Sequence, residues 1–171
     1  MPNEDKLNIA ATSDREIEMS RGFKAPRSLV FETLTVPALV SRWLLGPPGW
    51  SMPVCEIDLR VGGAYRYVWR GGDGTEIGVS GVYREITPPE RLVCTEIFDQ
   101  SWYPGEAIIT TILEDKDGET RLRTIMRYES RAARDAVLAS PMESGASASY
   151  DRLAALLTSP SSSAERRQGG T

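Results

Sequence analysis

The sequence contains no histidine, only two cysteines and no long apolar run. The absence of histidine excludes Ser-His-Asp and Cys-His triads and removes the commonest metal ligand. Cys55 and Cys94 lie far apart, with no second cysteine beside either to complete a metal-binding spacing, so we expect two buried free thiols. We therefore predict no metal site and no cofactor. Any catalysis would depend on carboxylates, tyrosine, lysine, cysteine or arginine.

Membrane and nucleic-acid partners are disfavoured by hydropathy and charge. No apolar stretch approaches the roughly 20 residues of a membrane-spanning helix, and residues 1–14 lack the basic start and apolar stretch of a secretory signal. The net charge is −4, and 20 basic residues are scattered among 24 acidic ones, so no basic patch is offered to a phosphate backbone. We expect a cytoplasmic protein that neither inserts into a membrane nor binds nucleic acid.

The length and composition are typical of one globular domain. The chain has 171 residues, of which 40% are hydrophobic and 26% are charged. Residues 1–14 are mostly polar and predict a flexible N-terminus, while residues 15–158 carry the periodic apolar pattern of a folded domain. Residues 159–171 begin with a Ser-Pro-Ser-Ser-Ser run and lack apolar content, which predicts a disordered tail.

One strand and two short helices are predicted at the start of this domain. Apolar and polar residues alternate over about residues 15–24, the period-two pattern of a strand with one buried face. Pro26 then suits the first turn of a helix, and Pro37 interrupts that helix and starts a second. The Gly-Pro-Pro-Gly sequence at 46–49 ends the second helix.

Six further strands are predicted between Trp50 and Tyr128. Turns rich in glycine and proline recur there about every ten residues and separate alternating segments, as in an antiparallel meander. The clearest segment places Tyr65, Tyr67 and Trp69 on one face and arginines on the other. With the first strand, these segments make a sheet of about seven strands that has one apolar, aromatic face and one basic face.

A long C-terminal helix is predicted after the sheet. Ser130 is a candidate cap for a short helix, and the run Ser140-Pro141-Met142-Glu143 combines a cap, a first-position proline and an acidic residue at the third position. An apolar stripe then continues to Leu157 for about four turns, which is long enough to lie across a sheet.

Several local motifs in this order resemble one known family, the activator of heat-shock protein 90 ATPase homologues of the START-like (SRPBCC) superfamily. The resemblance covers roughly residues 16–157. It rests on Ala25-Pro26 through Val30-Phe31, Ser41-Arg42-Trp43, Asp58-Leu59-Arg60-Val61-Gly62-Gly63, Gly81-Val82-Tyr83-Arg84-Glu85-Ile86, Pro88-Pro89-Glu90-Arg91-Leu92, Met142-Glu143-Ser144-Gly145 and Asp151-Arg152-Leu153.

The resemblance implies an α+β helix-grip fold, in which a curved antiparallel sheet wraps a long C-terminal helix and encloses a cavity. The chain departs from the family pattern at Leu44 and Ala146, where members often carry aromatic residues. Both changes shrink side chains, so they would enlarge or reshape the cavity.

Ten residues are candidates for the cavity wall. Strand parity and helix position nominate Tyr65, Tyr67, Trp69, Tyr83 and Met126 from the sheet, and Met142, Gly145 and Ser149 from the helix. Gly145 also suggests a close approach, because glycine destabilises a helix interior by about 1 kcal/mol. Trp43 either gates the cavity mouth or closes the core. Glu96 lies on a strand with two partly apolar faces, so it either points inward as a candidate acid or base or lies exposed.

The simpler alternative is that the aromatic residues only fill a core, since buried aromatics usually pack. As a set, however, three tyrosines and a tryptophan facing a helix suit an apolar pocket with a few polar groups, the usual form of a small-ligand site.

Three functions remain open on this basis. The leading hypothesis is a non-enzymatic module that binds a small hydrophobic or amphipathic ligand. The second is a module that docks on a chaperone or another protein through the outer sheet face, and an edge strand could also pair two copies into a homodimer. The third is a polyketide cyclase-like enzyme that uses Glu96 or a cavity tyrosine.

Overall fold

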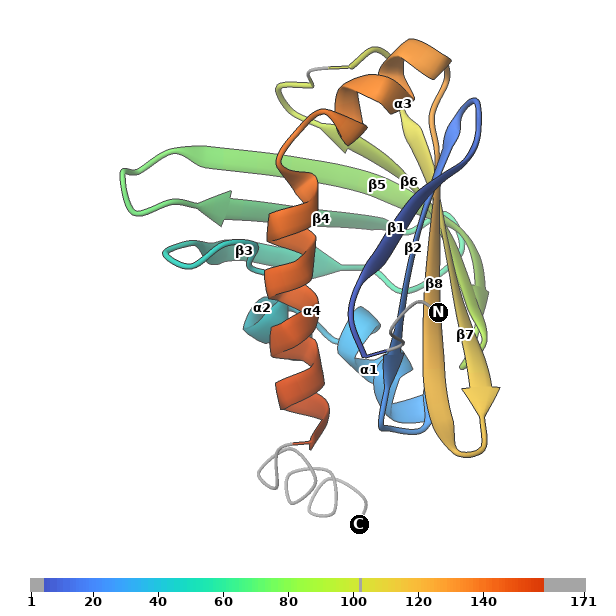
Figure 1. Ribbon diagram of the computed structural model, residues 1–171. Helices are drawn as coiled ribbons and strands as arrows, with labels where there is room; N and C mark the ends of the chain where they lie inside the picture. Colours follow the sequence, from blue (N-terminus) through green and yellow to red (C-terminus); the bar gives the residue numbers. More distant parts are fainter. Residues whose placement is uncertain (1–4, 102, 159–171) are drawn as a thin grey trace.

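The computed structural model describes residues 5–101 and 103–158, which form eight strands and four helices (Figure 1). In chain order these are β1 (Asn8–Ser13), β2 (Glu16–Phe23), α1 (Arg27–Thr35), α2 (Pro37–Trp43), β3 (Ser51–Ile57), β4 (Ala64–Arg70), β5 (Glu76–Thr87), β6 (Arg91–Phe98), β7 (Ala107–Lys116), β8 (Glu119–Arg127), α3 (Arg131–Leu138) and α4 (Met142–Thr158). The predicted two short helices, six-strand meander and long last helix are all present.

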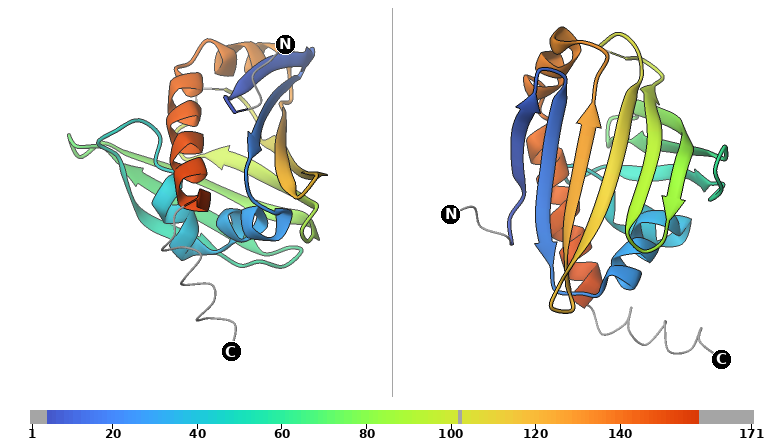
Figure 2. Two further views of the ribbon diagram at one scale, coloured as in Figure 1. Left: turned by 60° about the horizontal axis from the view of Figure 1, so that its bottom comes forward. Right: turned by 90° about the vertical axis from the view of Figure 1, so that its right-hand side faces the viewer.

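The strands form one antiparallel sheet in the order β1-β2-β8-β7-β6-β5-β4-β3. The sheet curves, and α4 runs across its concave side, while α1 and α2 lie near the C-terminal end of α4 and α3 lies near its other end (Figures 1 and 2). The helix-grip α+β fold is therefore confirmed. None of the helices within residues 5–101 and 103–158 is long and apolar enough to cross a membrane.

The alternating pattern of β2 produces its buried face. Ile17, Met19, Arg21 and Phe23 are buried, and the residues between them are only partly covered. The charged member of this face, Arg21, donates to Asp151 of α4 at 2.6 Å. Because successive strand residues point to opposite faces, a single register fixes all four side chains toward the helix.

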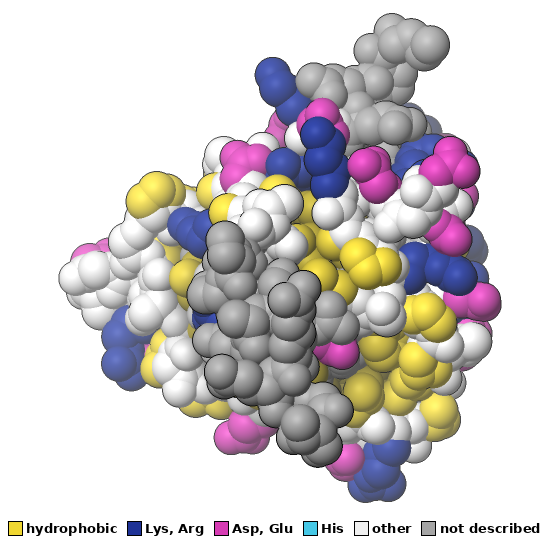
Figure 3. Space-filling view, turned by 90° about the horizontal axis from the view of Figure 1, so that it is seen from below, with side chains coloured by type: hydrophobic (Ala, Val, Ile, Leu, Met, Phe, Trp, Pro, Cys, Tyr) yellow, Lys and Arg dark blue, Asp and Glu magenta, His cyan; other side chains and the backbone are white. Residues whose placement is uncertain are grey.

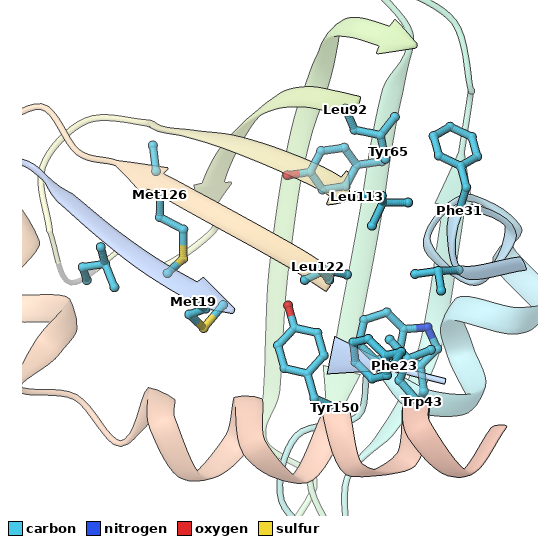
Figure 4. Packing of buried hydrophobic residues seen from close by; sticks show 14 of the residues in the cluster. Met19, Phe23, Phe31, Trp43, Tyr65, Leu92, Leu113, Leu122, Met126 and Tyr150 are labelled. Atoms are coloured by element: carbon cyan, nitrogen blue, oxygen red, sulfur yellow. The ribbon is translucent and has the colours of Figure 1, made fainter. Parts of the chain in front are cut away.

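The C-terminal half of α4 holds the helix on the sheet. Leu153 is fully buried, and Leu156 and Leu157 are nearly so. Tyr150 stacks on Trp43 of α2 with ring centroids 5.7 Å apart and also contacts Phe23 of β2 (Figure 4). This apolar cluster joins the sheet, α2 and α4 into one core.

The flexible N-terminus predicted over residues 1–14 differs from the structure, because Asn8–Ser13 forms an eighth strand that pairs with β2. This strand is largely exposed and lacks the alternating apolar pattern that would reveal it in the sequence. It is held instead by backbone pairing and by Arg134 of α3, which donates to the Ser13 carbonyl oxygen. The tail predicted over residues 159–171 lies outside the described residues.

The two predicted helix caps have different outcomes. The Ser130 hydroxyl accepts from the Ala133 backbone N–H at 3.0 Å, so the predicted cap of α3 is confirmed. The Ser140 hydroxyl instead donates to the Val137 carbonyl oxygen, so this residue finishes α3 rather than capping α4. Only three residues separate the end of α3 from the start of α4, so the Ser140 side chain lies within reach of the last turn of α3.

The outer face of the sheet carries arginines, as predicted, but it is not uniformly basic. Five of these arginines pair with acidic side chains: Arg66 with Asp99, Arg84 with Glu106, Arg91 with Glu85, Arg123 with Glu18 and Arg127 with Glu16. Charges of both signs are also mixed on the face seen from below the molecule (Figure 3). Paired surface charges of this kind contribute little stability each.

Gly81 of β5 provides a test of the packing. A Cβ atom at this position would lie 1.9 Å from the Thr95 carbonyl oxygen and 2.5 Å from Cε1 of Tyr65. We expect Gly81→Ala to lower the free energy of unfolding by about 1–3 kcal/mol, because neither neighbour has room to move. Chemical denaturation would measure this. Gly72→Ala, where the nearest atom is 3.9 Å from the added Cβ, is the matched control and should change little; equal effects would contradict the packing argument.

Candidate functional site

Two hollows lie between α4 and the sheet. The inner cavity has a volume of about 230 Å³ and is lined by Met19, Leu34, Val40, Trp43, Leu44, Tyr65, Tyr67, Trp69, Val79, Tyr83, Leu92, Cys94, Glu96, Ile109, Thr111, Leu122, Thr124, Met126 and Tyr150. The outer cleft has a volume of about 680 Å³ and is lined by Leu44, Leu45, Gly46, Pro47, Trp50, Trp69, Ile77, Phe98, Ser140, Pro141, Met142, Ser144, Gly145, Ala146 and Ser149. Leu44 and Trp69 belong to both linings, so the two hollows adjoin there.

Every predicted site residue lines one of these hollows. The inner cavity receives Trp43, Tyr65, Tyr67, Trp69, Tyr83, Glu96 and Met126, whereas the outer cleft receives Met142, Gly145 and Ser149 and shares Trp69. The prediction from strand parity that these sheet residues face the concave side is therefore correct. Their role in binding a ligand stays a prediction.

The N-terminal half of α4 explains why space remains beside the sheet. Residues 144–149 read Ser-Gly-Ala-Ser-Ala-Ser, so this stretch has only small side chains, and four of the six residues line the outer cleft. The large side chains Tyr150, Leu153 and Leu157 follow in the next turns and are buried. The helix thus fills the core at one end and leaves a hollow at the other.

Aromatic rings form the wall of the inner cavity on β4 and β5. The ring centroid of Tyr65 lies 5.1 Å from that of Tyr67 and 5.6 Å from that of Tyr83, and Tyr67 lies 6.0 Å from Trp69. The Tyr65 hydroxyl donates to the Thr95 carbonyl oxygen at 2.6 Å, and the Tyr67 and Tyr83 hydroxyls interact with each other. The rings are therefore held in place by their own partners rather than left free to fill the cavity.

The loop after α2 separates the two hollows and is fixed on both sides. The Trp69 indole N–H donates to the Leu44 carbonyl oxygen at 2.7 Å. The Gly46 backbone N–H donates to the Ser149 hydroxyl at 2.8 Å, and Arg152 donates to the Gly46 carbonyl oxygen at 2.7 Å. Gly46 has a φ of 68°, which glycine adopts readily. Both backbone groups of Gly46 are thus bound by α4.

Trp43 closes the core, although its ring also borders the inner cavity. Its side chain is buried, stacks on Tyr150, and donates from the indole N–H to the Thr33 carbonyl oxygen at 2.8 Å. The alternative of a gating residue at the mouth is not supported by this placement.

Gly145 does not mark a close approach. A Cβ atom there would lie 3.5 Å from Cδ of Pro47, an ordinary van der Waals distance. The sequence interpretation of this glycine as a contact point is wrong; its place in the run of small residues widens the outer cleft instead.

Glu96 of β6 points into the inner cavity, which decides between the two orientations left open by the sequence. Its cross-strand neighbour on β7 is Ala107, whose small side chain is fully buried. Burial raises the pKa of the Glu96 carboxyl to about 7. Burial also raises the pKa of the nearby Cys94 thiol to about 12, so this cysteine is protonated at neutral pH and is not an activated nucleophile.

Sequence reasoning missed most of the outer cleft. Leu45, Pro47 and Trp50 come from the loop after α2, and Phe98 comes from the end of β6. The available signal was the apolar run around Gly-Pro-Pro-Gly at 46–49, since a loop with so many apolar residues must cover or line something.

The comparisons with known proteins now identify the family. The family model described as Activator of Hsp90 ATPase homolog 1-like protein matches residues 24–158. This chain belongs to that family. Its departures at Leu44 and Ala146 from what members often carry are both in the outer cleft lining. No curated protein matches the sequence significantly.

Solved structures agree with this assignment. A crystal structure of a Rhodobacter sphaeroides protein is 34% identical, covers 90% of this chain and 98% of its own, and superposes with a TM-score of 0.84. A Chromobacterium violaceum protein is 28% identical, with coverages of 86% and 99% and a TM-score of 0.72. An AHSA1 protein from Silicibacter pomeroyi is 25% identical, with coverages of 83% and 96% and a TM-score of 0.68. This chain therefore spans nearly the whole length of these relatives.

The raised pKa of Glu96 predicts an unusual pH dependence of stability. The unfolded carboxyl ionises near the ordinary value of 4.5, whereas the folded one stays protonated up to about 7, so this group makes the fold less stable as the pH rises between these values. Glu96→Gln removes the effect. We expect the variant to gain up to about 3 kcal/mol over the parent protein between pH 4 and pH 8, measured by denaturation across that range.

The matched control is Glu56→Gln on β3, which removes one exposed carboxylate. The stability difference caused by Glu96→Gln should change more with pH than the difference caused by this control. An equal change in the two variants would contradict the raised pKa of Glu96.

Proposed function

We propose that this protein binds a small hydrophobic or amphipathic molecule that enters through the outer cleft and reaches the inner cavity. The observation that supports this most directly is the pair of adjoining hollows at Leu44 and Trp69, lined almost entirely by apolar and aromatic side chains. Ligand sites usually combine such a lining with a few polar groups. Here the polar groups are Glu96, tyrosines and two threonines in the inner cavity, and three serines in the outer cleft.

The volumes set the scale of the ligand. A dry cavity of about 150 Å³ accepts benzene, so the inner cavity of about 230 Å³ has room for one aromatic ring or a short chain with a small substituent. The outer cleft of about 680 Å³ falls within the range of drug-sized ligand pockets. A molecule with one ring or chain inside and a larger body in the cleft fits this arrangement.

A polyketide cyclase-like enzyme is the second candidate, and the position of Glu96 favours it. A carboxyl with a pKa of about 7 inside an apolar cavity can take or give a proton near neutral pH. The Tyr65 hydroxyl, which could otherwise assist as an acid or base, already donates a hydrogen bond to the Thr95 carbonyl oxygen. The chemistry would then rest on Glu96 alone.

Docking on a chaperone or another protein, and pairing into a homodimer, also stay predictions. The family description refers to an activator of the Hsp90 ATPase. The charges on the outer sheet face are paired with each other, as Arg66 is with Asp99. Because the pairs leave no patch of one sign, this face would not strongly attract a partner of either charge.

Blocking the outer cleft tests the binding proposal. We expect N-phenyl-1-naphthylamine, a fluorescent apolar probe, to bind the parent protein, raise its melting temperature and brighten on binding. Gly145→Trp should reduce its affinity at least about tenfold, because the indole would occupy the cleft opposite Pro47. Fluorescence titration and thermal melting would measure both effects.

The control is Ala155→Trp, which places the same side chain at an exposed position of α4. This variant should bind the probe like the parent protein. If neither this probe nor a diverse set of apolar compounds shifts the melting temperature, the binding proposal fails.

A further inference from the structure

Glu96 is the one side chain with a formal charge among the described residues that line the inner cavity and the outer cleft. Within residues 5–101 and 103–158, no arginine or lysine lines either hollow. Among the same residues, none donates a hydrogen bond to the Glu96 carboxyl or forms an ion pair with it. A carboxyl in an apolar cavity is normally stabilised by a cation or by several donors, and the described part of the chain supplies neither.

We propose that the inner cavity selects an organic cation, an amine with an apolar or aromatic body, whose ammonium group binds the Glu96 carboxylate. This inference rests on the proposed function, because it names the class of ligand that the same cavity takes. The ligand supplies the positive charge that the cavity wall lacks.

The Glu96 carboxyl can be reached from the inner cavity. Glu96 lines this cavity and is only partly covered. Tyr65 packs over Gly81 of the neighbouring strand, and its hydroxyl donates to the Thr95 carbonyl oxygen at 2.6 Å, so its ring is held against the sheet. An ammonium group in the cavity can therefore approach the carboxyl.

The aromatic wall of the inner cavity favours the same kind of ligand. The rings that line this cavity together with Glu96 include Tyr65, Tyr67, Trp69 and Tyr83. The faces of aromatic rings attract cations, most strongly when the cation is out of water. An anionic ligand would meet the carboxylate, so it is disfavoured.

Four other titratable groups near Glu96 are found in the described part of the chain, and none of them changes its charge near neutral pH. The titratable groups that face it are Tyr65 of β4, Cys94 of β6, Tyr103 between β6 and β7, and Tyr128 after β8. Burial raises the pKa of each of them, so all four stay uncharged. The affinity for a cation should thus follow the ionisation of Glu96.

Three small probes separate the charge from the apolar body. They are 2-phenylethylamine, 2-phenylethanol and phenylacetate, which share one ring and differ in the end group. At a pH one unit above the Glu96 pKa of about 7, we expect the amine to bind at least about tenfold more tightly than the alcohol, and phenylacetate to bind most weakly. Isothermal titration calorimetry would measure the three dissociation constants.

Glu96→Gln keeps the shape of the side chain and removes its charge. We expect this variant to bind the amine and the alcohol with affinities within about twofold of each other, while the affinity for the alcohol changes little. Glu56→Gln, an exposed change of equal charge, should keep the full preference for the amine. Below the Glu96 pKa, binding of the amine should also release a proton to the buffer, seen as a heat that depends on the buffer's ionisation enthalpy.

The outcomes distinguish this inference from the proposed function. If the amine and the alcohol bind the parent protein equally well, the cavity binds small molecules and the selection of cations is wrong. If none of the three probes binds and the larger apolar compounds also fail, the proposed function itself is wrong. Preference for the amine that persists in Glu96→Gln would overturn the role of this residue.

Discussion

The burial of the C-terminal half of α4 against the concave face of the sheet is the contact on which the rest of the structure depends. Tyr150 and Leu153 bring together α2, β2 and the helix, and burying large side chains of this kind contributes about 1.5–3 kcal/mol each. Residues 144–149 of α4 carry only small side chains and make no comparable contact. The same helix therefore anchors the domain at one end and leaves the outer cleft at the other.

The parts of the fold with regular patterns could be predicted from the sequence. β2 alternates cleanly because only one of its faces is buried, and Pro26 and Pro37 mark the starts of α1 and α2. β1 could not be predicted, because an edge strand held by its backbone needs no apolar pattern. Five residues of the inner cavity were found by parity, because they lie on strands of the sheet: Tyr65, Tyr67, Trp69, Tyr83 and Met126.

The less regular features depended on three-dimensional contacts. The direction of Glu96 was undetermined because β6 has apolar residues on both faces, and only its pairing with β7 decides which residues face the helix. Gly145 was misread because the space beside it depends on where Pro47 of a distant loop lies, which no local pattern reveals. The outer cleft was missed for the same reason, as it is built from chain segments separated by about 100 residues, such as Gly46 and Ser149.

The hydrogen bonds at Gly46 have a consequence for the speed of ligand exchange. Because Ser149 and Arg152 bind both backbone groups of Gly46, the loop between the hollows moves away from α4 only when two hydrogen bonds break together. The Trp69–Leu44 hydrogen bond adds a third on the sheet side. A ligand that moves between the hollows only when this loop opens would then exchange at the rate at which the loop is released. Its residence time would depend on how tightly Ser149, Arg152 and Trp69 hold the loop.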